Sequence, residues 1–353
     1  MQPGRRAVRT DHVRTHPRGE LPCPRTRTAH VSRTPRQPAH AVRKPSPVPS
    51  RRPARCCSRR PAARPPPPPP PRPRPSRPPS RSSAAPRPAA PAVPEPAALA
   101  GAKVNVGEGA TVGVGMPISV TFPRPVPRAE RAAVEHWLGV DARPAVTGAW
   151  SWVKDRNLLD GQRVDYRPPA YWKPGTRVTL RVGSHAVRRF SIGRSLTATV
   201  DVRTHTMTVT EDGRPDTRIP VTAGRPGLDT WNGTMVVMDK QPRVYMDSRT
   251  VGLGDAYHGY YAWAVHTTTS GTYVHQNPAA NTHAGRANVT HGCVGLATDG
   301  TAERFYRRVI PGDVIRVTGS KDTVEPGNGY GDWNLTWSEW LAHSATRHGG
   351  DAR

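Results

Sequence analysis

The sequence predicts a mainly β protein of two modest domains preceded by a disordered tail. Three observations point to this class: the composition changes abruptly near residue 100, short segments of alternating polarity recur after it, and few stretches have a helical period. Residues 101–353 have an ordinary globular composition and are numerous enough for two domains. The same composition excludes collagen, a coiled coil and a polytopic membrane protein.

Residues 1–100 form the predicted tail. They hold 22 of the 52 basic residues and 27 of the 42 prolines, but only three acidic residues and no aromatic residue. Such a segment cannot bury enough apolar surface to offset its chain entropy, so we expect it to be disordered. It fits a basic arm attracted to polyanions or a solvated, proline-rich linker. We favour the linker and expect no specific nucleic-acid partner, because no aromatic side chain is available for base stacking.

The N-terminus shows no secretory signal. Arg5, Arg6 and Arg9 are similar to a charged n-region, but charges and prolines continue and no apolar h-region follows. Cys56 and Cys57 lie between arginines, without the apolar run of a lipid-anchored signal. The sequence as it stands shows no export route, and a wrongly assigned start codon could also produce such a tail.

Residues 101–190 predict a small β-sandwich, because short alternating segments are separated by turn residues. The predicted strands are Thr111–Val114, Ile118–Phe122, Ala149–Val153 and Val178–Val182. Residues 129–138 fit either a helical turn or a polar-rich strand. The core is the expected place for the tryptophans of this region, and a sugar-binding surface is the alternative. These tryptophans are Trp137, Trp150, Trp152 and Trp172.

Residues 191–320 predict a second, mainly β domain with one short helix. Alternation is sharper here, and Asp212-Gly213 is a strong hairpin signal. The best helix candidate is Thr301–Val309, where Phe305 and Val309 lie four residues apart on one face. The predicted strands are Leu196–Val202, Met207–Thr210, Ile219–Ala223, Met235–Met238, Tyr261–Val265, Thr272–His275 and Val314–Val317.

Residues 321–353 form a C-terminal extension that is rich in tryptophan. Trp333, Trp337 and Trp340 are spaced four and three residues apart, which would place three indoles on one side of a helix. We expect this face to pack on the preceding domain of residues 191–320 rather than to bind a free ligand.

Cys293 is the candidate nucleophile of the folded region. The other three cysteines lie in the tail, so Cys293 has no disulfide partner within the folded region. It ends the run Thr290-His291-Gly292-Cys293, and His275 ends a predicted strand. A thiolate is nucleophilic and an imidazole can accept the thiol proton, so the pattern fits covalent catalysis. A buried inert cysteine beside a structural histidine is the alternative, and no metal is expected, because a second cysteine and suitably spaced carboxylates are missing.

The segment from His275 to Thr290-His291-Gly292-Cys293-Val294 resembles the signature of the L,D-transpeptidase (YkuD-like) catalytic domain. Residues 271–275 and 312–317 are similar to its histidine-bearing strand and its closing strand. Residues 150–172 resemble the immunoglobulin-like domain that precedes the catalytic domain in actinobacterial members, and residues 332–340 resemble their C-terminal extension. The resemblance implies an immunoglobulin-like β-sandwich at residues 101–190, a β-rich catalytic domain at 191–320 and the extension at 321–353.

The resemblance also implies a two-step acyl transfer on peptidoglycan. Cys293 would attack a tetrapeptide donor stem, release D-alanine and leave a thioester. A side-chain amine of a neighbouring acceptor stem would then resolve the thioester into a 3→3 cross-link. His275 matches the general base and His291 would shape the site. Inhibition by carbapenems, no metal or organic cofactor, and a monomer are expected.

The resemblance also implies which residues would contact the substrate. The Gly292 amide would contribute to an oxyanion hole, since glycine lets the backbone approach closely. Tyr257 would supply the oxyanion hole or a lid contact with the substrate, and Gln276, Thr290 and Gly295 would lie along the bound stems. The implied location is extracytoplasmic, at the cell wall or the outer face of the membrane, and we give this chemistry more weight than the missing signal.

Two positions depart from the family pattern. Gln276 follows the histidine where many relatives carry serine, which costs little if that residue acts through its backbone carbonyl. Gly295 stands where asparagine or arginine usually follows the Cys-Val pair, so we expect looser substrate positioning. An L,D-carboxypeptidase of the same fold and a non-catalytic wall-binding or polyanion-binding protein are the alternatives.

Overall fold

The computed structural model describes residues 93–346. Residues 1–92 of the expected tail, and residues 347–353, lie outside the described residues. Residues 93–100, also assigned to the tail, pack on the following strands: the 3-10 helix η1 (Ala97–Leu99) buries Leu99, and the Glu95 carboxylate accepts a hydrogen bond from the Ser184 N–H at 2.6 Å. The first folded unit therefore includes residues on the N-terminal side of the expected boundary at residue 100.

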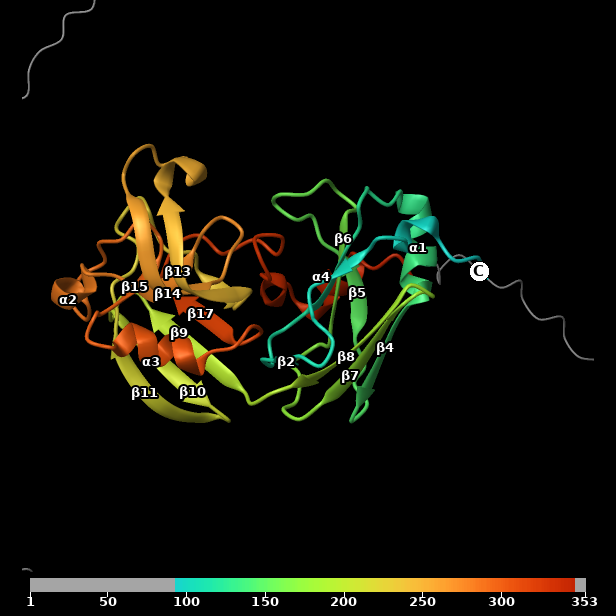
Figure 1. The fold of residues 1–353 in the computed structure, drawn as a ribbon, viewed down its shortest axis with the longest axis horizontal. Helices are drawn as coiled ribbons and strands as arrows, with labels where there is room; N and C mark the ends of the chain where they lie inside the picture. Colours follow the sequence, from blue (N-terminus) through green and yellow to red (C-terminus); the bar gives the residue numbers. More distant parts are fainter. Residues whose placement is uncertain (1–92, 347–353) are drawn as a thin grey trace, which may run out of the picture. The chain divides into compact units, whose positions relative to one another are not determined.

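Two four-stranded sheets build the immunoglobulin-like unit, as the sequence predicts (Figure 1). One sheet has the strand order β1-β3-β6-β5 and the other β2-β8-β7-β4. Apolar side chains from both sheets meet in one core, since inward-facing residues alternate with exposed ones along strands such as β7. The strands are β1 (Lys103–Val104), β2 (Thr111–Val112), β3 (Ile118–Thr121), β4 (Leu138–Arg143), β5 (Ala149–Trp152), β6 (Arg163–Arg167), β7 (Arg177–Val182) and β8 (Ala186–Ile192).

Helix α1 (Arg128–Trp137) decides the open choice for residues 129–138 in favour of a helix. Its buried positions include Val134 and Glu135, while most of its charged residues face solvent. The expected core placement of the tryptophans holds for three of them. Trp150, Trp152 and Trp172 are buried, and Trp137 is only partly buried at the edge of this core.

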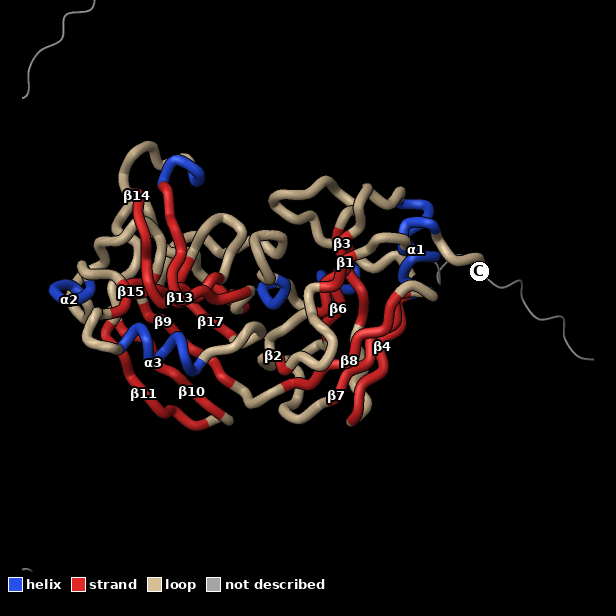
Figure 2. The backbone as a smooth tube through the Cα atoms, in the orientation of Figure 1, coloured by secondary structure: helices blue, strands red, loops and turns tan. Residues whose placement is uncertain are grey.

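A five-stranded and a four-stranded sheet build the second unit (Figure 2). Their orders are β11-β10-β9-β17-β12 and β13-β14-β15-β16. The strands are β9 (Leu196–Asp201), β10 (Thr206–Glu211), β11 (Arg214–Pro220), β12 (Gly233–Val236), β13 (Asp239–Asp247), β14 (His258–His266), β15 (Tyr273–Gln276), β16 (Val294–Leu296) and β17 (Val314–Thr318). The short 3-10 helix η2 (Ser248–Val251) follows β13.

One hydrophobic core joins both sheets of the second unit to helix α3 (Thr301–Arg308). Phe305 and Val309, the predicted apolar pair, both lie in this core, although the helix ends at Arg308 and Val309 is its C-cap. Asp212-Gly213 closes the β10–β11 hairpin with positive φ at both residues, as such a two-residue turn requires. The structure adds a second short helix, α2 (Ala280–His283), that the sequence did not predict.

The C-terminal extension contains the 3-10 helix η3 (Asp332–Asn334) and helix α4 (Trp337–Ala342). A single helix through all three tryptophans is wrong, because Thr336 caps the N-terminus of α4 and separates it from η3. The Asn334 side chain exchanges hydrogen bonds with the Thr234 backbone of the second unit, at 2.7 and 2.8 Å. The expected packing of the extension on residues 191–320 therefore accounts for only part of the contacts that the extension makes.

The tryptophans of the extension lie against the immunoglobulin-like unit. The indole rings of Trp333, Trp337 and Trp340 surround the Arg167 guanidinium at 4.8, 5.5 and 4.5 Å. Trp340 is fully buried, and its indole N–H donates to the Ala149 carbonyl at 3.0 Å. Cation–π contacts and apolar burial together hold the extension on this unit.

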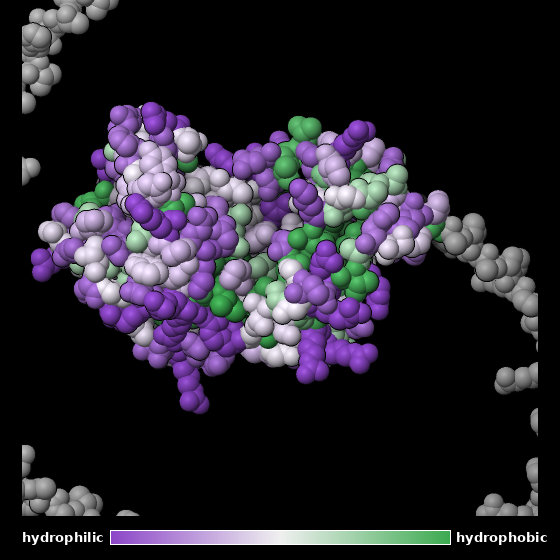
Figure 3. Space-filling view, viewed as in Figure 1, coloured by the Kyte–Doolittle hydropathy of each residue, from purple (hydrophilic) through white to green (hydrophobic). Residues whose placement is uncertain are grey.

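The described part of the chain has a largely polar surface. Most of the face in Figure 3 is hydrophilic, with hydrophobic atoms grouped mainly over the immunoglobulin-like strands. Among the helices of residues 93–346, none has both the length and the apolar character needed to cross a bilayer.

Candidate active site

Parallel pairing of β15 with β16 creates the candidate site. His275 is in register with Gly295, and Val274 with Val294, so Cys293, which precedes β16, lies at the Tyr273 end of β15, two positions from the partner of His275. The side chains of Cys293 and His275 line one hollow. Residues separated by 18 positions in the sequence are therefore adjacent because of strand pairing, and no local motif alone would bring them together.

The Cys293 thiol lies in a pocket of backbone groups. Its sulfur accepts a hydrogen bond from the Tyr273 N–H at 3.4 Å and donates to the Gly271 carbonyl at 3.7 Å. Within residues 93–346, Cys293 is a free cysteine that forms no disulfide. These contacts fix the position of the sulfur without neutralising a charge on it.

The His275 imidazole is held by its neighbour in the chain. Its Nδ1 lies 2.6 Å from the Gln276 carbonyl oxygen, which can only accept, so Nδ1 carries the proton and Nε2 is the basic atom. The edge of the Tyr261 ring contacts the imidazole, with ring centroids 5.0 Å apart. The residue after the histidine thus orients it through the backbone, where glutamine and serine are equivalent.

Desolvation keeps both groups neutral, with His275 buried and Cys293 half-buried. It lowers the pKa of His275 to about 4, against the opposing effect of the hydrogen bond to Gln276. It raises the pKa of Cys293 to about 11, and the Tyr273 N–H only partly offsets this. At neutral pH the site therefore holds a thiol and an imidazole rather than a thiolate–imidazolium pair.

Tyr257 and His291 lie next to each other at the mouth of the site, with ring centroids 5.3 Å apart. Burial raises the pKa of Tyr257 to about 12, so its hydroxyl keeps its proton and can donate. Burial, with the charge of Arg225, lowers the pKa of His291. Both rings are thus available as neutral hydrogen-bonding groups near Cys293.

The Thr290 hydroxyl braces the turn that presents the cysteine. It donates to the Cys293 carbonyl at 2.6 Å and accepts from the Gly292 N–H at 3.3 Å. Gly292 has φ +117°, a conformation that favours glycine. The Gly292 N–H therefore already has a hydrogen-bond acceptor, whereas the Cys293 N–H has no hydrogen-bond partner within residues 93–346.

Gly295 faces two other side chains rather than open space. A Cβ built there would lie 2.9 Å from Thr222 Cγ2 and 3.0 Å from Asn277 Cβ. The side chains of Thr222 and Asn277 therefore fill the space that a larger residue would need. Asn277 also lines the hollow beside Cys293, and its side-chain oxygen accepts from the Ala279 N–H at 3.0 Å.

Two hollows meet at Cys293. The first, of about 500 Å³, is lined by residues that include His275, Gln276, Thr290 and Tyr257. The second, of about 380 Å³, is lined by Gly271, Gly292 and residues from elsewhere in the chain. Tyr257, His291 and Cys293 line both. The structure thus brings together the eight residues singled out in the sequence, with Gly295 behind the wall rather than at its surface.

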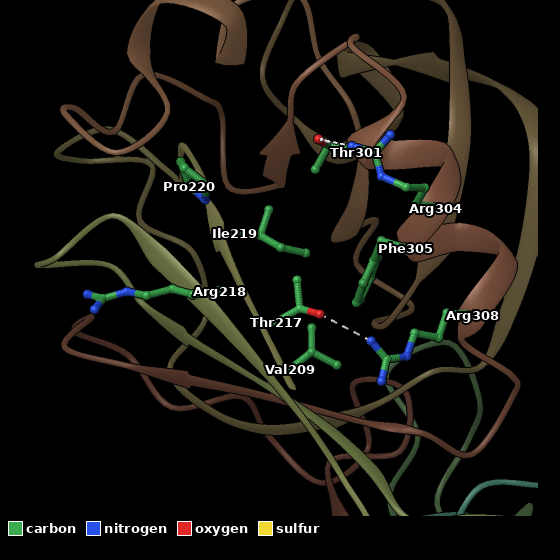
Figure 4. Close-up of a pocket in the computed structure, with 9 residues that line it drawn as sticks. All are labelled: Val209, Thr217, Arg218, Ile219, Pro220, Thr301, Arg304, Phe305 and Arg308. Atoms are coloured by element: carbon green, nitrogen blue, oxygen red, sulfur yellow. Dashed lines mark hydrogen bonds between the residues drawn. The ribbon is translucent and has the colours of Figure 1, made fainter. Parts of the chain in front are cut away.

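A third hollow, of about 400 Å³, contains none of these residues (Figure 4). It lies between β10, β11 and helix α3, with Val209, Ile219 and Phe305 directed into it. Arg308 donates to Thr217 across it, and Arg218 points away. Within residues 93–346, no group of three or more histidine, cysteine or acidic side chains could hold a metal ion.

Several site residues were not identified from the sequence. Tyr261 and Tyr273 border the imidazole and the thiol, and the aromatic density of these strands was the signal that could have found them. Asn277 follows the histidine by two positions, so attention to its neighbours would have included it. Arg156 of the immunoglobulin-like unit lines the second hollow, and nothing local in the sequence indicates that.

Two family models match the chain. A bacterial Ig domain matches residues 91–187, and the L,D-transpeptidase catalytic domain (YkuD) matches residues 196–317. These spans agree with the two units of the fold.

Individual L,D-transpeptidases are also similar in sequence to this chain. L,D-transpeptidase 2 of Mycobacterium tuberculosis (strain CDC 1551 / Oshkosh) is 32% identical over 247 residues, which are 65% of this chain and 58% of that relative. L,D-transpeptidase 1 of M. tuberculosis (strain ATCC 25618 / H37Rv) is 36% identical over 207 residues, 58% of this chain and 78% of that protein. The chain thus spans less than two thirds of the length of the first relative.

A solved structure of the LD transpeptidase LdtMt1 in complex with imipenem is 35% identical to this chain. The match covers 61% of this chain and 97% of the solved one, with a TM-score of 0.55.

Proposed function

The chain belongs to the L,D-transpeptidase family, and we propose that it forms 3→3 cross-links in peptidoglycan through a thioester on Cys293. The observation that carries this proposal is that Cys293 lies where two hollows meet and shares the first of them with His275. Two substrates must approach one sulfur from different directions, and two hollows supply that access.

In the first step the thiol attacks a tetrapeptide donor. The sulfur forms a bond to the carbonyl carbon of the third residue, and the thiol proton passes to Nε2 of His275. The tetrahedral intermediate collapses as the bond to D-alanine breaks, and the imidazolium returns the proton to the leaving amine. Cys293 is left as a thioester and His275 is neutral again.

In the second step an amine of a neighbouring stem attacks the thioester. His275 accepts a proton from that amine, the carbon–sulfur bond breaks, and the sulfur leaves as a thiolate that takes the proton back. A new amide joins the two stems, and the original thiol is restored. If water attacks instead, the same steps give an L,D-carboxypeptidase.

The oxyanion of each tetrahedral intermediate needs nearby donors. The Cys293 N–H and the Tyr257 hydroxyl are the groups available, and the Gly292 N–H can join them by exchanging its contact with Thr290. His291 packs on Tyr257 and holds it in place. Gln276 and Thr290 line the first hollow along the bound stem, and Gly295 acts indirectly by leaving room for Asn277.

The same thiol is the proposed target of carbapenems, because the solved relative contains imipenem and this chain shares its fold. A peptidoglycan substrate also requires an extracytoplasmic location, at the wall or the outer face of the membrane.

The proposal is tested with the full chain and a disaccharide-tetrapeptide, by mass spectrometry of the products. We expect a cross-linked dimer from the unmodified protein and no product from Cys293→Ala. The matched control replaces the three tail cysteines, Cys23, Cys56 and Cys57, with alanine and should leave the dimer unchanged.

Tripeptide and free D-alanine without a dimer would favour the carboxypeptidase. Product formation by Cys293→Ala would overturn the assignment of the nucleophile. No turnover with an intact fold would favour a wall-binding protein.

A further inference from the structure

A loop of the immunoglobulin-like unit reaches the second hollow at Cys293. Arg156 and Asn157 line this hollow together with Gly292 and Cys293, although they precede the catalytic sheets by more than 30 positions in the sequence. The site is therefore built by both folded units.

This loop is held in place by several contacts. The Arg156 N–H donates to the Gly327 carbonyl at 2.9 Å, and the Asn157 N–H donates to Asp155 Oδ1 at 2.8 Å. Asp155 in turn forms a buried ion pair with Arg163 at 2.7 Å. Gly327 lies so close that an added Cβ would be 1.9 Å from the Lys154 carbonyl oxygen. The backbone that carries Arg156 is thus anchored at several points.

The Arg156 side chain itself is unoccupied. No hydrogen bond, ion pair or ring contact engages its guanidinium within residues 93–346, and it is exposed. The hollow's acidic residue is Asp229, whose carboxylate accepts from the Gly227 N–H at 3.2 Å and lies 3.4 Å from the exposed Lys321 ammonium group. Arg156 thus supplies this hollow with a cation that has no ion-pair partner among the described residues. Asp229 supplies a carboxylate whose ion pair with Lys321 lies at the surface and is therefore weak.

The position of His275 indicates which half of the donor lies here. His275 lines the first hollow and not the second. The leaving amine must receive its proton from the imidazole, so that amine belongs in the first hollow. The acyl half of the donor, which ends in the third residue of the stem, is then directed into the second hollow.

The third residue is a diamino acid, because its side-chain amine is the nucleophile when the same stem acts as acceptor. In a donor stem this side chain takes no part in the reaction, so the enzyme must accommodate it in a binding site. When it ends in an amino-acid head, it carries one carboxylate and one ammonium group on a single carbon. These charges match the one cation and one anion of the second hollow.

We propose that the second hollow binds the amino-acid head at the side-chain end of the donor's third residue, with Arg156 binding its carboxylate and Asp229 its ammonium group. This inference rests on the proposed function and adds the residue that selects the donor. It assigns the immunoglobulin-like unit a direct role in substrate recognition.

The test compares two donors that differ only at this head. One disaccharide-tetrapeptide has diaminopimelate as its third residue, and the other has lysine, which keeps the amine and lacks the carboxylate. A hydrogen bond to a charged group contributes about 1.5–3 kcal/mol, so we expect kcat/KM to be about 10–100-fold higher for the diaminopimelate donor.

Arg156→Gln should bring the two donors to within about twofold by lowering only the diaminopimelate value. Arg156→Lys should retain part of the preference, since a lysine keeps the charge and loses the bidentate geometry. Lys154→Gln is the matched control, because Lys154 is an exposed cation two residues away that lines a different hollow. It should keep the full preference.

Equal use of both donors by the unmodified chain would overturn the proposal, as would an equal loss for both donors in Arg156→Gln. Binding of the two stems to Cys293→Ala, measured by calorimetry, separates this inference from the proposed function. Tighter binding of the diaminopimelate stem, lost in Cys293→Ala/Arg156→Gln, supports the inference even without turnover. Equal binding of both stems contradicts it.

Discussion

Two sites in the molecule bury polar groups in opposite ways. In the immunoglobulin-like unit, Arg163 forms buried ion pairs with Asp155 and Asp165, and all three side chains are less than a tenth exposed. At the candidate active site, His275 is buried and Cys293 is half-buried, and desolvation keeps both groups neutral. Fixed opposite charges hold a structure together, whereas a neutral pair can pass a proton and return to its starting state.

The largest expected effect comes from breaking the charged cluster. Arg163→Met leaves Asp155 and Asp165 without their cation, and an unpaired buried charge costs about 3–5 kcal/mol. We expect urea unfolding to show a loss of free energy of unfolding of that size. The control is Arg189→Met, whose ion pair with Glu108 is exposed on both sides and whose loss should cost under about 1 kcal/mol. A similar loss for both variants would contradict the distinction.

The next effect concerns acid stability. The folded pKa of His275, about 4, lies below its ordinary value of 6.5, so the unfolded chain binds more protons between these values. Stability from this group is therefore complete above pH 6.5 and is lost as the pH falls towards 4. The loss amounts to about 3 kcal/mol.

Replacing His275 should remove this dependence of the free energy of unfolding on pH. Chemical denaturation of the full chain and of His275→Gln, followed from pH 7 to pH 4, should give curves that diverge, with the variant the less sensitive to acid. Parallel curves would mean that His275 is not buried as a neutral group.

The smallest effect concerns Gly295. Gly295→Asn would force a Cβ against Thr222 and Asn277, and overpacking of this kind costs about 1–3 kcal/mol. Asn277→Gly should relieve part of that cost in the double variant. The melting temperatures of the two single variants and the double variant measure this coupling. Additive losses would show that the two positions do not share one space.

The sequence indicated the candidate site but not its surroundings. The run from Thr290 to Cys293 and His275 could be singled out because a nucleophile and a base must be particular residue types, and the structure brings these residues to one hollow. The role of Gln276 could not be decided from its identity, since it acts through a carbonyl that every residue carries. The space behind Gly295 was equally hidden, because Thr222 arrives from a distant segment.

The fold shows the same limit. Alternation of polarity predicted most strands and helix α3, because burial on one face repeats along the chain. It did not predict that the tryptophans of the extension would surround Arg167 of the other unit, or that Arg156 would reach the second hollow. Both depend on contacts between segments far apart in sequence, which local periodicity does not encode.

In the resting protein Cys293 is a neutral thiol that shares one hollow with the neutral imidazole of His275. The most direct measurement is the ultraviolet absorbance of the thiolate as a function of pH, taken as the difference between the full chain and Cys293→Ala, so that the tail cysteines cancel. We expect the Cys293 thiolate to form only near pH 11. A thiolate that forms at or below the ordinary thiol pKa of about 8.5 would contradict it.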